Sequence, residues 1–140
     1  DHVILVNNAT LGGHVHVGEW GIIGGLSAIH QFVRVGKHAM IGGMSGVEQD
    51  VIPYGSVTGN RARLQGLNIV GLKRRSFSRD DIHEMRKAYR LIFAAEGTMA
   101  ERLEDVAEDF GNNEAVMDIL QFIRANTSRA ICQPAMDDAA

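Results

Sequence analysis

Four histidines near the start of the chain carry the side chains best suited to acid–base chemistry. They are His14, His16, His30 and His38, and their spacing does not match a zinc site. Taken alone, such a histidine is more often an ordinary polar surface residue than a catalyst. Gln31 follows His30, and an imidazole and an amide beside exposed backbone N–H groups can bind a sugar or stabilise an oxyanion.

A second polar group consists of Asn68 and the basic triplet Lys73, Arg74 and Arg75. A basic triplet is commonly just a solvated run of charge. This one lies in a glycine-rich segment and not in a polar tail, which favours a phosphate-bearing ligand, because arginine pairs with phosphate oxygens through two parallel hydrogen bonds. The chain has no Ser-His-Asp pattern and no phosphate-cradling glycine loop.

A strict six-residue repeat over residues 5–52 must position the histidines. Its fifth positions are small or β-branched, its second positions are often glycine, and its first positions are all aliphatic: Leu5, Leu11, Val17, Ile23, Ile29, Val35, Ile41 and Val47. A helix has a period of 3.6 residues and a simple strand a period of two, so this period fits neither. Hexapeptide repeats are typical of a parallel β-helix, an all-β solenoid.

Three hexads per coil predict a triangular prism. Residues three hexads apart then stack at roughly 4.8 Å, so Leu5 lies under Ile23 and Leu11 under Ile29. We expect the small fifth-position residues and the glycines to let the backbone turn at the corners. The same spacing places Gly12–Gly13 one coil below His30–Gln31, opening a slot beside His14.

The repeat ends at Pro53, and the composition changes near residue 76. We therefore expect a solenoid over residues 1–55, an irregular exit over 56–77 and a small three-helix domain over 78–140. Ser78, the capping box Thr98–Glu101 and Asn113 mark the three helix starts, and the last dozen residues are expected to be frayed.

Charge and composition narrow the class of protein. Residues 1–77 carry a net charge of +3 (seven Lys and Arg, four Asp and Glu) and residues 78–140 a net charge of −6 (seven and thirteen). This split favours anionic ligands near the first half, whereas the few basic residues without interleaved aromatic residues argue against nucleic acid. The single Cys132 is compatible with a reducing compartment, and the chain has no apolar run as long as a membrane span and no signal peptide.

Large apolar residues recur on the glycine-rich surface of the predicted prism, namely Trp20, Phe32, Met40 and Met44. A prism of two to three coils leaves such side chains uncovered. Three prisms packed around a threefold axis would bury them and create clefts between neighbouring chains.

Two segments link the chain to a known family. The run NNATLGGHVHVGEWGIIGGLSAIHQFVRVGKHAMIGGMSGVEQDVIPY, followed by GLNIVGLKRRSFS, closely resembles the acyl-[acyl-carrier-protein]–UDP-N-acetylglucosamine O-acyltransferases of lipid A synthesis. The resemblance covers essentially the whole chain and implies a left-handed β-helix in a cytoplasmic homotrimer that needs no cofactor. It also implies transfer of a 3-hydroxyacyl group from acyl carrier protein to the glucosamine 3-hydroxyl, with a histidine as general base.

The resemblance also assigns roles to individual residues. It implies that the Gly13 N–H stabilises the oxyanion, that Gly43 limits acyl-chain length, and that seven positions including Gly13 form the reaction and substrate sites: Gly13, His14, His30, Gln31, Asn68, Arg74 and Arg75. Among these, His14, His30 and Gln31 are similar to residues near the sugar, and Asn68, Arg74 and Arg75 are similar to nucleotide and phosphate contacts.

The chain departs from the family pattern in two ways. The family's general-base histidine precedes the stretch that matches Asp1, and His2 does not match it, so we expect upstream coils and an inactive chain on its own. Val70 stands where the family variant has an acidic residue, which leaves the ribose contact of that residue without a counterpart.

Several alternatives remain open at this point. The acidic carrier protein needs a basic surface, for which Arg86, Lys87 and Arg90 are candidates by charge, although ordinary solvation of a helix surface is the more common explanation for such residues. An N-acyltransferase of the same pathway and a diamino-sugar acyltransferase are runner-up enzymes. A hexapeptide-repeat binding or shell protein of the carbonic-anhydrase type would require three metal-binding histidines across subunits.

Overall fold

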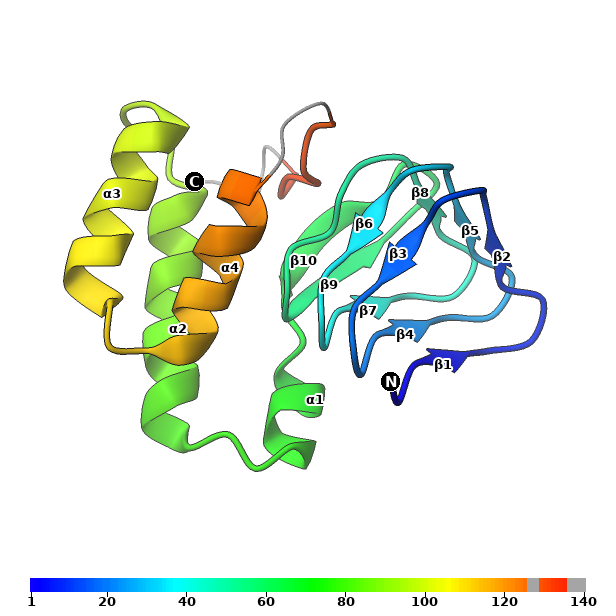
Figure 1. The fold of residues 1–140 in the computed structure, drawn as a ribbon, viewed down its shortest axis with the longest axis horizontal. Helices are drawn as coiled ribbons and strands as arrows, with labels where there is room; N and C mark the ends of the chain where they lie inside the picture. The colour runs from blue at the N-terminus through cyan, green and yellow to red at the C-terminus, as the bar shows by residue number, and fades with distance from the viewer. Residues whose placement is uncertain (126–128, 136–140) are drawn as a thin grey trace.

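The hexads form the coils of a β-solenoid, and helices follow it along the chain (Figure 1). The computed structural model describes residues 1–125 and 129–135. Each of the first eight strands is a residue pair, because a hexad spends its other positions on the corner. They are β1 (Ile4–Leu5), β2 (Thr10–Leu11), β3 (His16–Val17), β4 (Ile22–Ile23), β5 (Ala28–Ile29), β6 (Arg34–Val35), β7 (Met40–Ile41) and β8 (Gly46–Val47).

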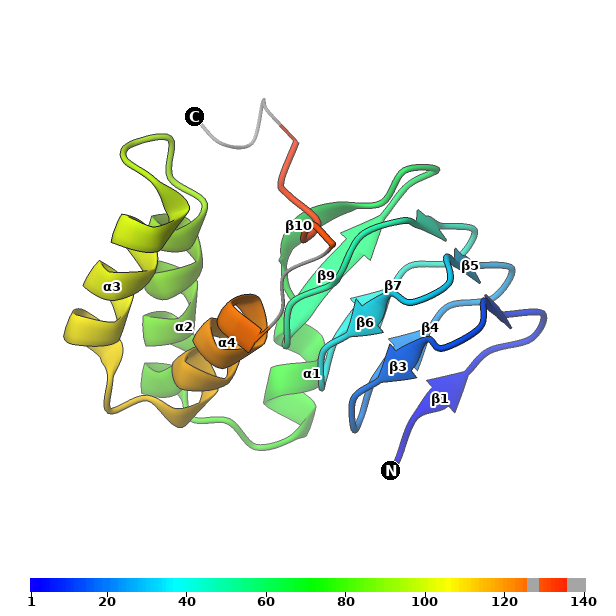
Figure 2. The same ribbon diagram turned by 45° about the horizontal axis from the view of Figure 1, so that its top comes forward.

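The predicted register is confirmed. Three parallel sheets, β1-β4-β7, β2-β5-β8 and β3-β6, form the faces of the prism, and paired residues are three hexads apart, as in Leu5↔Ile23 and Leu11↔Ile29. The coils lie one above another in Figure 2. Ile23 and Ile41 are fully buried inside, so the aliphatic first positions form the solenoid core.

The corners turn at residues other than glycine, contrary to our expectation. The fourth residue of seven of the eight hexads has a positive φ close to 60°, as at His14 (61°), Trp20 (61°) and His38 (57°). This region strains a side chain with a Cβ. In compensation, each of these corner N–H groups from Trp20 onward donates to a carbonyl of the coil below, as His38 does to Glu19 at 2.8 Å.

The second-position glycines instead serve the close stacking of coils. A Cβ on Gly12 would lie 2.6 Å from the backbone nitrogen of Gln31, and one on Gly36 would lie 2.4 Å from that of Pro53. Both contacts are with backbone atoms, which cannot move aside. The glycines are therefore explained by the proximity of the next coil and not by the turn.

The exit segment over residues 56–77 is ordered, which corrects the expectation of irregular structure. Strand β9 (Gly55–Thr58) pairs in parallel with β7, and β10 (Arg63–Leu67) returns antiparallel to β9 with a register shift near Gly66. A short helix α1 (Ile69–Arg74) follows. The hexad repeat did not predict β9 because Met40 pairs with Ser56 and not with position 58, which lies three hexads after it. The hexad spacing is therefore broken while the sheet continues.

Three amphipathic helices make up the rest of the tail, as predicted: α2 (Arg79–Ile92), α3 (Met99–Phe110) and α4 (Glu114–Ala125). Ser78 caps α2 by accepting from the Asp81 N–H, and Thr98 caps α3 by accepting from that of Glu101. Their apolar faces pack together around fully buried side chains such as Met85, Val106 and Ile119. No helix in the described ranges is long and apolar enough to cross a membrane.

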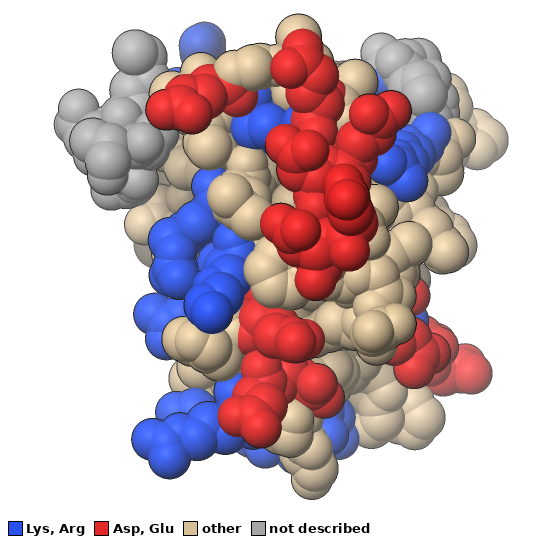
Figure 3. Space-filling model, turned by 90° about the vertical axis from the view of Figure 1, so that its left-hand side faces the viewer, with Lys and Arg blue, Asp and Glu red and all other residues tan. Residues whose placement is uncertain are grey.

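Charge is unevenly spread over the helices. Helix α3 carries five Asp and Glu side chains, whereas four cations lie on α2. The face in Figure 3 accordingly shows a band of Asp and Glu with Lys and Arg gathered beside it. The net negative charge of the tail therefore does not prevent a locally basic surface.

The C-terminal segment returns to the solenoid, so the expectation of frayed residues is wrong for residues 129–135, while residues 136–140 lie outside the described ranges. Asp50 forms a β-bridge with Ile131, and Leu64 forms one with Pro134. Cys132 is 1% exposed, and its thiol lies 3.5 Å from the Gln49 carbonyl oxygen. A stretch that was expected to be frayed thus covers the side of the last coil.

Burial of Cys132 predicts slow alkylation of the folded chain. Desolvation raises the pKa of this thiol to about 11. Because only the thiolate reacts, about one molecule in a thousand is reactive at pH 8, and the rate should rise about tenfold per pH unit up to that pKa. Iodoacetamide labelling followed by mass spectrometry measures this rate. Denaturing urea should accelerate labelling strongly, and equally fast labelling in its absence would contradict the packed C-terminal segment.

Candidate functional site

Three of the four residues in the second polar group predicted from the sequence line one hollow. Helix α1 stands off the outer face of the sheet β1-β4-β7, and the space between them, about 530 Å³, is here called the solenoid-side hollow. Ile22 and Met40 line its apolar side. Its polar and aromatic lining comprises Trp20, His38, Ser56, Asn68, Arg74 and Arg75. Asn68, Arg74 and Arg75 therefore line one hollow, as predicted substrate residues. Trp20 and His38 line it too, although neither was assigned a role in substrate binding.

Asn68 uses its side chain to hold α1 in place. Its Oδ1 accepts from the Gly71 N–H at 3.1 Å, which caps the helix, and its Nδ2 donates to the His38 carbonyl oxygen at 3.0 Å. Both ends of the amide are thus engaged within the chain. Asn68 lines the hollow, and these bonds make it the tie between α1 and the solenoid.

Arg75 lies against an aromatic column on one corner of the prism. Its guanidinium carbon is 3.3 Å from the centroid of the Trp20 ring. The His2 ring stacks on Trp20 at 4.0 Å, and further along the column His38 stacks on Tyr54 at 5.3 Å. These residues share the corner because three of them lie three hexads apart, at positions 2, 20 and 38. A hydrogen bond of 2.7 Å from the Tyr54 hydroxyl to Asp118 connects the column to α4.

His38 is held in its neutral form. Burial, and then the positive charges of Lys37 and Arg75, lower the pKa of its imidazole below the ordinary value. Glu19 and Asp118 act in the opposite direction but more weakly. At neutral pH the column therefore has no cation at His38, and Arg75 supplies positive charge beside it.

The basic triplet is divided between two hollows. Arg74 and Arg75 line the solenoid-side hollow, whereas Lys73 lines a second hollow of about 560 Å³ between α1 and α2, here called the helix-side hollow. The charged and titratable residues of this second lining are Lys73, Arg79, His83 and Arg86. No acidic residue lines it, and no ion pair to its cations occurs within the described residues.

The other predicted residues lie on a different corner. Gly13 and His14 precede β3, His30 and Gln31 precede β6, and all four are exposed. The predicted alignment is confirmed, since a Cβ on Gly12 would touch the backbone at Gln31. The His14 ring stacks on Phe32 at 4.9 Å, and none of the four residues lines the solenoid-side hollow. Within one chain, the β3-β6 face separates the two halves of the predicted site.

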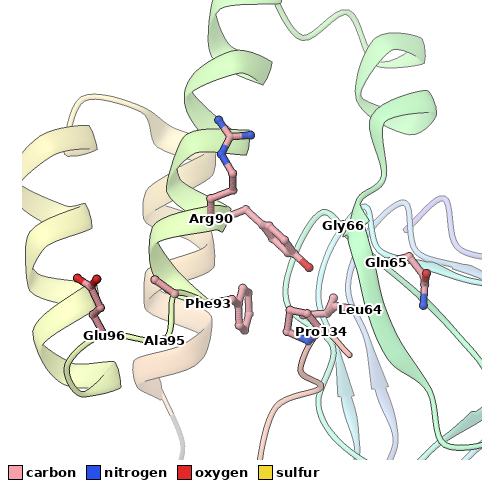
Figure 4. Close-up of a pocket in the computed structure, with 10 residues that line it drawn as sticks. Leu64, Gln65, Gly66, Arg90, Phe93, Ala95, Glu96 and Pro134 are labelled. Carbon is pink, nitrogen blue, oxygen red and sulfur yellow. The ribbon is translucent and has the colours of Figure 1, made fainter. Parts of the chain in front are cut away.

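A hollow larger than these two lies elsewhere. It has about 690 Å³ and lies between β10 and α2, with Leu64, Phe93 and Pro134 in its wall (Figure 4). The Arg90 guanidinium in that view points away from Pro134 and Leu64. Arg90, a candidate for carrier docking, lines this hollow, but none of the predicted reaction and substrate residues does, so size alone does not locate the chemistry.

Trp20 and His38 are the site residues that the sequence reasoning did not assign. The signal was available, because aromatic or imidazole rings recur at one corner in successive coils while Arg75 follows in a basic triplet. Within the described part of the chain, no group of three or more His, Cys, Asp or Glu side chains could hold a metal ion.

A left-handed parallel β-helix of hexads with a helical tail defines the class as a hexapeptide-repeat protein. A family profile described as UDP N-acetylglucosamine O-acyltransferase, domain 2, matches residues 50–132. The chain therefore belongs to the UDP-N-acetylglucosamine O-acyltransferase family.

Individual relatives agree with this assignment. An acyl-[acyl-carrier-protein]–UDP-N-acetylglucosamine O-acyltransferase from Caulobacter vibrioides is 56% identical over 134 residues, covering 96% of this chain and 51% of the relative. The solved UDP-N-acetylglucosamine acyltransferase of Arabidopsis has a TM-score of 0.90 at 40% identity, covering 95% of this chain and 49% of that one. That of Campylobacter jejuni has a TM-score of 0.85 at 40% identity, with 94% and 50% covered. The chain spans about half the length of these relatives.

Proposed function

We propose that the protein is an acyltransferase that moves a 3-hydroxyacyl chain from acyl carrier protein to the 3-hydroxyl of UDP-N-acetylglucosamine, the first step of lipid A synthesis. The observation that carries the proposal is the meeting of Asn68, Arg74 and Arg75 at one hollow in a chain of this family. Two guanidinium groups on one wall suit the diphosphate of a nucleotide sugar. We place the reaction in the cytoplasm and assign it no cofactor.

The chemistry requires a base, an oxyanion donor and a leaving thiol. A histidine outside this chain takes the proton from the sugar hydroxyl, whose oxygen attacks the thioester carbonyl, and the carrier thiol leaves as the ester forms. We assign the oxyanion contact to the Gly13 N–H, which has no acceptor among the described residues. A Cβ on Gly13 would meet no atom within 4 Å, so crowding within the chain does not explain the glycine.

A homotrimer would join the two halves of the site. His14, His30 and Gln31 lie at one corner and the solenoid-side hollow at another, so a neighbouring prism would bring one chain's histidines to another chain's arginines. Exposed apolar side chains on the solenoid support such packing, with Leu26 at 61%, Phe32 at 55% and Met44 at 73% exposure.

An acyl-transfer assay tests the proposed function. The full-length protein is incubated with acyl carrier thioesters of different lengths and either UDP-N-acetylglucosamine or its 3-amino analogue, and the products are identified by mass spectrometry. We expect an ester on UDP-N-acetylglucosamine. Transfer to the amino analogue alone would favour the diamino-sugar alternative, and no transfer to either would contradict the proposal.

Gly43 is the proposed limit on chain length. It is exposed, and a Cβ there would lie 3.4 Å from the Gly25 carbonyl oxygen, which is an ordinary van der Waals contact. In the same assay, Gly43→Met should shift the preference to shorter acyl chains. The glycine itself leaves room for a long one.

The helix-side hollow is the proposed landing site for the acidic carrier protein. Arg86 lines it together with Lys73 and Arg79, while Lys87 follows on α2. We expect the Arg86→Glu/Lys87→Glu variant to raise KM for the carrier substrate roughly tenfold, because like charge opposes docking. KM for the nucleotide sugar should stay unchanged. The control is Arg124→Glu, which reverses one exposed charge on α4. An equal rise in KM for the carrier substrate in this control would mean that net charge alone explains the result.

A further inference from the structure

The contact between Arg75 and Trp20 is the closest ring–cation contact in the described structure, at 3.3 Å, against 4.1 Å for Arg34 over Phe122. The His2 ring is stacked on the indole at 4.0 Å with an interplanar angle of 6°. The His2 ring and the Arg75 guanidinium are both so close to the indole that they cannot occupy the same face of it. Arg75 therefore covers the face opposite His2.

That face leaves room for the guanidinium. His38 is next in the column, and its ring centroid is 6.3 Å from that of Trp20, a wider spacing than the 4.0 Å between Trp20 and His2. His38 is neutral near pH 7, because burial and neighbouring cations lower its pKa. The guanidinium thus meets no positive charge from His38.

A guanidinium that is stacked through its face keeps its N–H groups free at its edge. Five donors lie in that plane, in the fork that matches phosphate oxygens. No side-chain hydrogen bond to Arg75 occurs within the described residues. The backbone of Arg75 is fixed as well, since its N–H donates to the Gly71 carbonyl oxygen at the end of α1.

We propose that Trp20 is a positioning residue, whose indole holds the Arg75 guanidinium with its N–H edge toward the solenoid-side hollow, ready to bind a phosphate of the nucleotide sugar. The inference rests on the proposed function, because it refines the phosphate contact of that site. Without the indole, Arg75 would be a flexible side chain that must be ordered each time a ligand binds.

Calorimetric titration of the full-length protein with UDP-N-acetylglucosamine tests the proposal. We expect Trp20→Leu to weaken binding roughly tenfold, the loss of one cation–π contact. Trp20→Phe keeps an aromatic face and should restore most of the affinity. In turnover, KM for the sugar should rise with kcat nearly unchanged.

A double-mutant cycle separates this inference from the proposed function. If Trp20 acts through Arg75, Trp20→Leu should add no further loss to Arg75→Gln. An effect of Trp20→Leu that persists in the Arg75→Gln protein, or no effect when Arg75→Gln alone weakens binding, would overturn the positioning role and leave the phosphate site intact. No effect of Arg75→Gln would instead contradict that phosphate contact of the proposed function.

Fluorinated tryptophan provides a second test that preserves the fold. Trp20 is the only tryptophan of the 140 residues, so fluorotryptophan alters a single ring of this chain. Each fluorine withdraws charge from the ring face with little change of shape, so affinity for UDP-N-acetylglucosamine should fall stepwise with the number of fluorines. A constant affinity across the series would refute the role of Trp20, even if Trp20→Leu fails to fold.

Discussion

Asp50→Ala should destabilise the protein by roughly 3 kcal/mol, a large part of the stability of a small domain. Asp50 is 2% exposed, and its carboxylate accepts hydrogen bonds from the backbone N–H and the Nε of Arg34, both at 2.9 Å. Arg34 Nη2 is also 2.9 Å from Oδ2 without forming a further hydrogen bond, so it contributes charge alone. Removing the carboxylate leaves the guanidinium 22% exposed and uncompensated.

The effect is expected to be this large because three parts of the fold meet at Asp50. Arg34 also donates to the Phe122 carbonyl oxygen of α4 at 3.1 Å, and the backbone of Asp50 bonds to Ala130 and Cys132 of the C-terminal segment. Loss of the carboxylate therefore loosens the contact of the solenoid with α4 and the C-terminal segment together.

Urea unfolding measures the effect, provided that the slope of the transition is unchanged. Asp50→Asn retains an acceptor for the Arg34 N–H but not the charge, so it should lie between Asp50→Ala and the unmodified protein. The matched control is Glu48→Ala, since Glu48 is 60% exposed and 3.9 Å from Arg61, a pair worth at most about 0.5 kcal/mol. Equal losses of stability for Asp50→Ala and Glu48→Ala would contradict the proposed role of Asp50 in joining the solenoid to α4 and the C-terminal segment.

The solenoid was predictable because its period is carried by buried side chains. Ile23 and Ile41 must face inward in every coil, so spacing alone sets the register. Corner conformation was not predictable from spacing. The left-handed φ of His38 is stabilised by its bond to the Glu19 carbonyl oxygen, which exists only once two coils are stacked.

The exit and the C-terminal segment were missed for a different reason. Strand β9 has no hexad period, and its position is set by pairing with β7 on one side and β10 on the other. Cys132 lies in a short stretch with no periodic pattern, and a backbone hydrogen bond to Asp50, far earlier in the chain, holds it against the solenoid. Local sequence contains no signal for such contacts.

The candidate site was predicted in its residue types but not in its grouping. Consecutive residues on a helix point about 100° apart, so Lys73 and Arg74 face different hollows once α1 is a helix. The glycines at 66 and 71 had suggested an irregular segment, in which the triplet would act as one cluster. The division of the triplet is therefore a consequence of α1.

This division predicts opposite phenotypes for two neighbouring cations. Arg74→Gln should weaken binding of UDP-N-acetylglucosamine about 10- to 100-fold, because a charge-assisted hydrogen bond contributes about 1.5–3 kcal/mol. Lys73→Gln removes the same formal charge one residue earlier, but from the helix-side hollow. It should change sugar affinity by no more than about twofold and should instead raise KM for the carrier substrate.

Calorimetry with the sugar and initial rates with varied carrier concentration measure the two effects on the same preparations. The pair controls for net charge and for helix propensity, since both substitutions place Gln on α1 and both wild-type side chains are exposed. If Lys73→Gln weakens sugar binding as much as Arg74→Gln does, the triplet acts as one diffuse positive patch. If the sugar affinities of the two variants differ by tenfold or more, the orientation of α1, and not local charge, determines which ligand each cation meets.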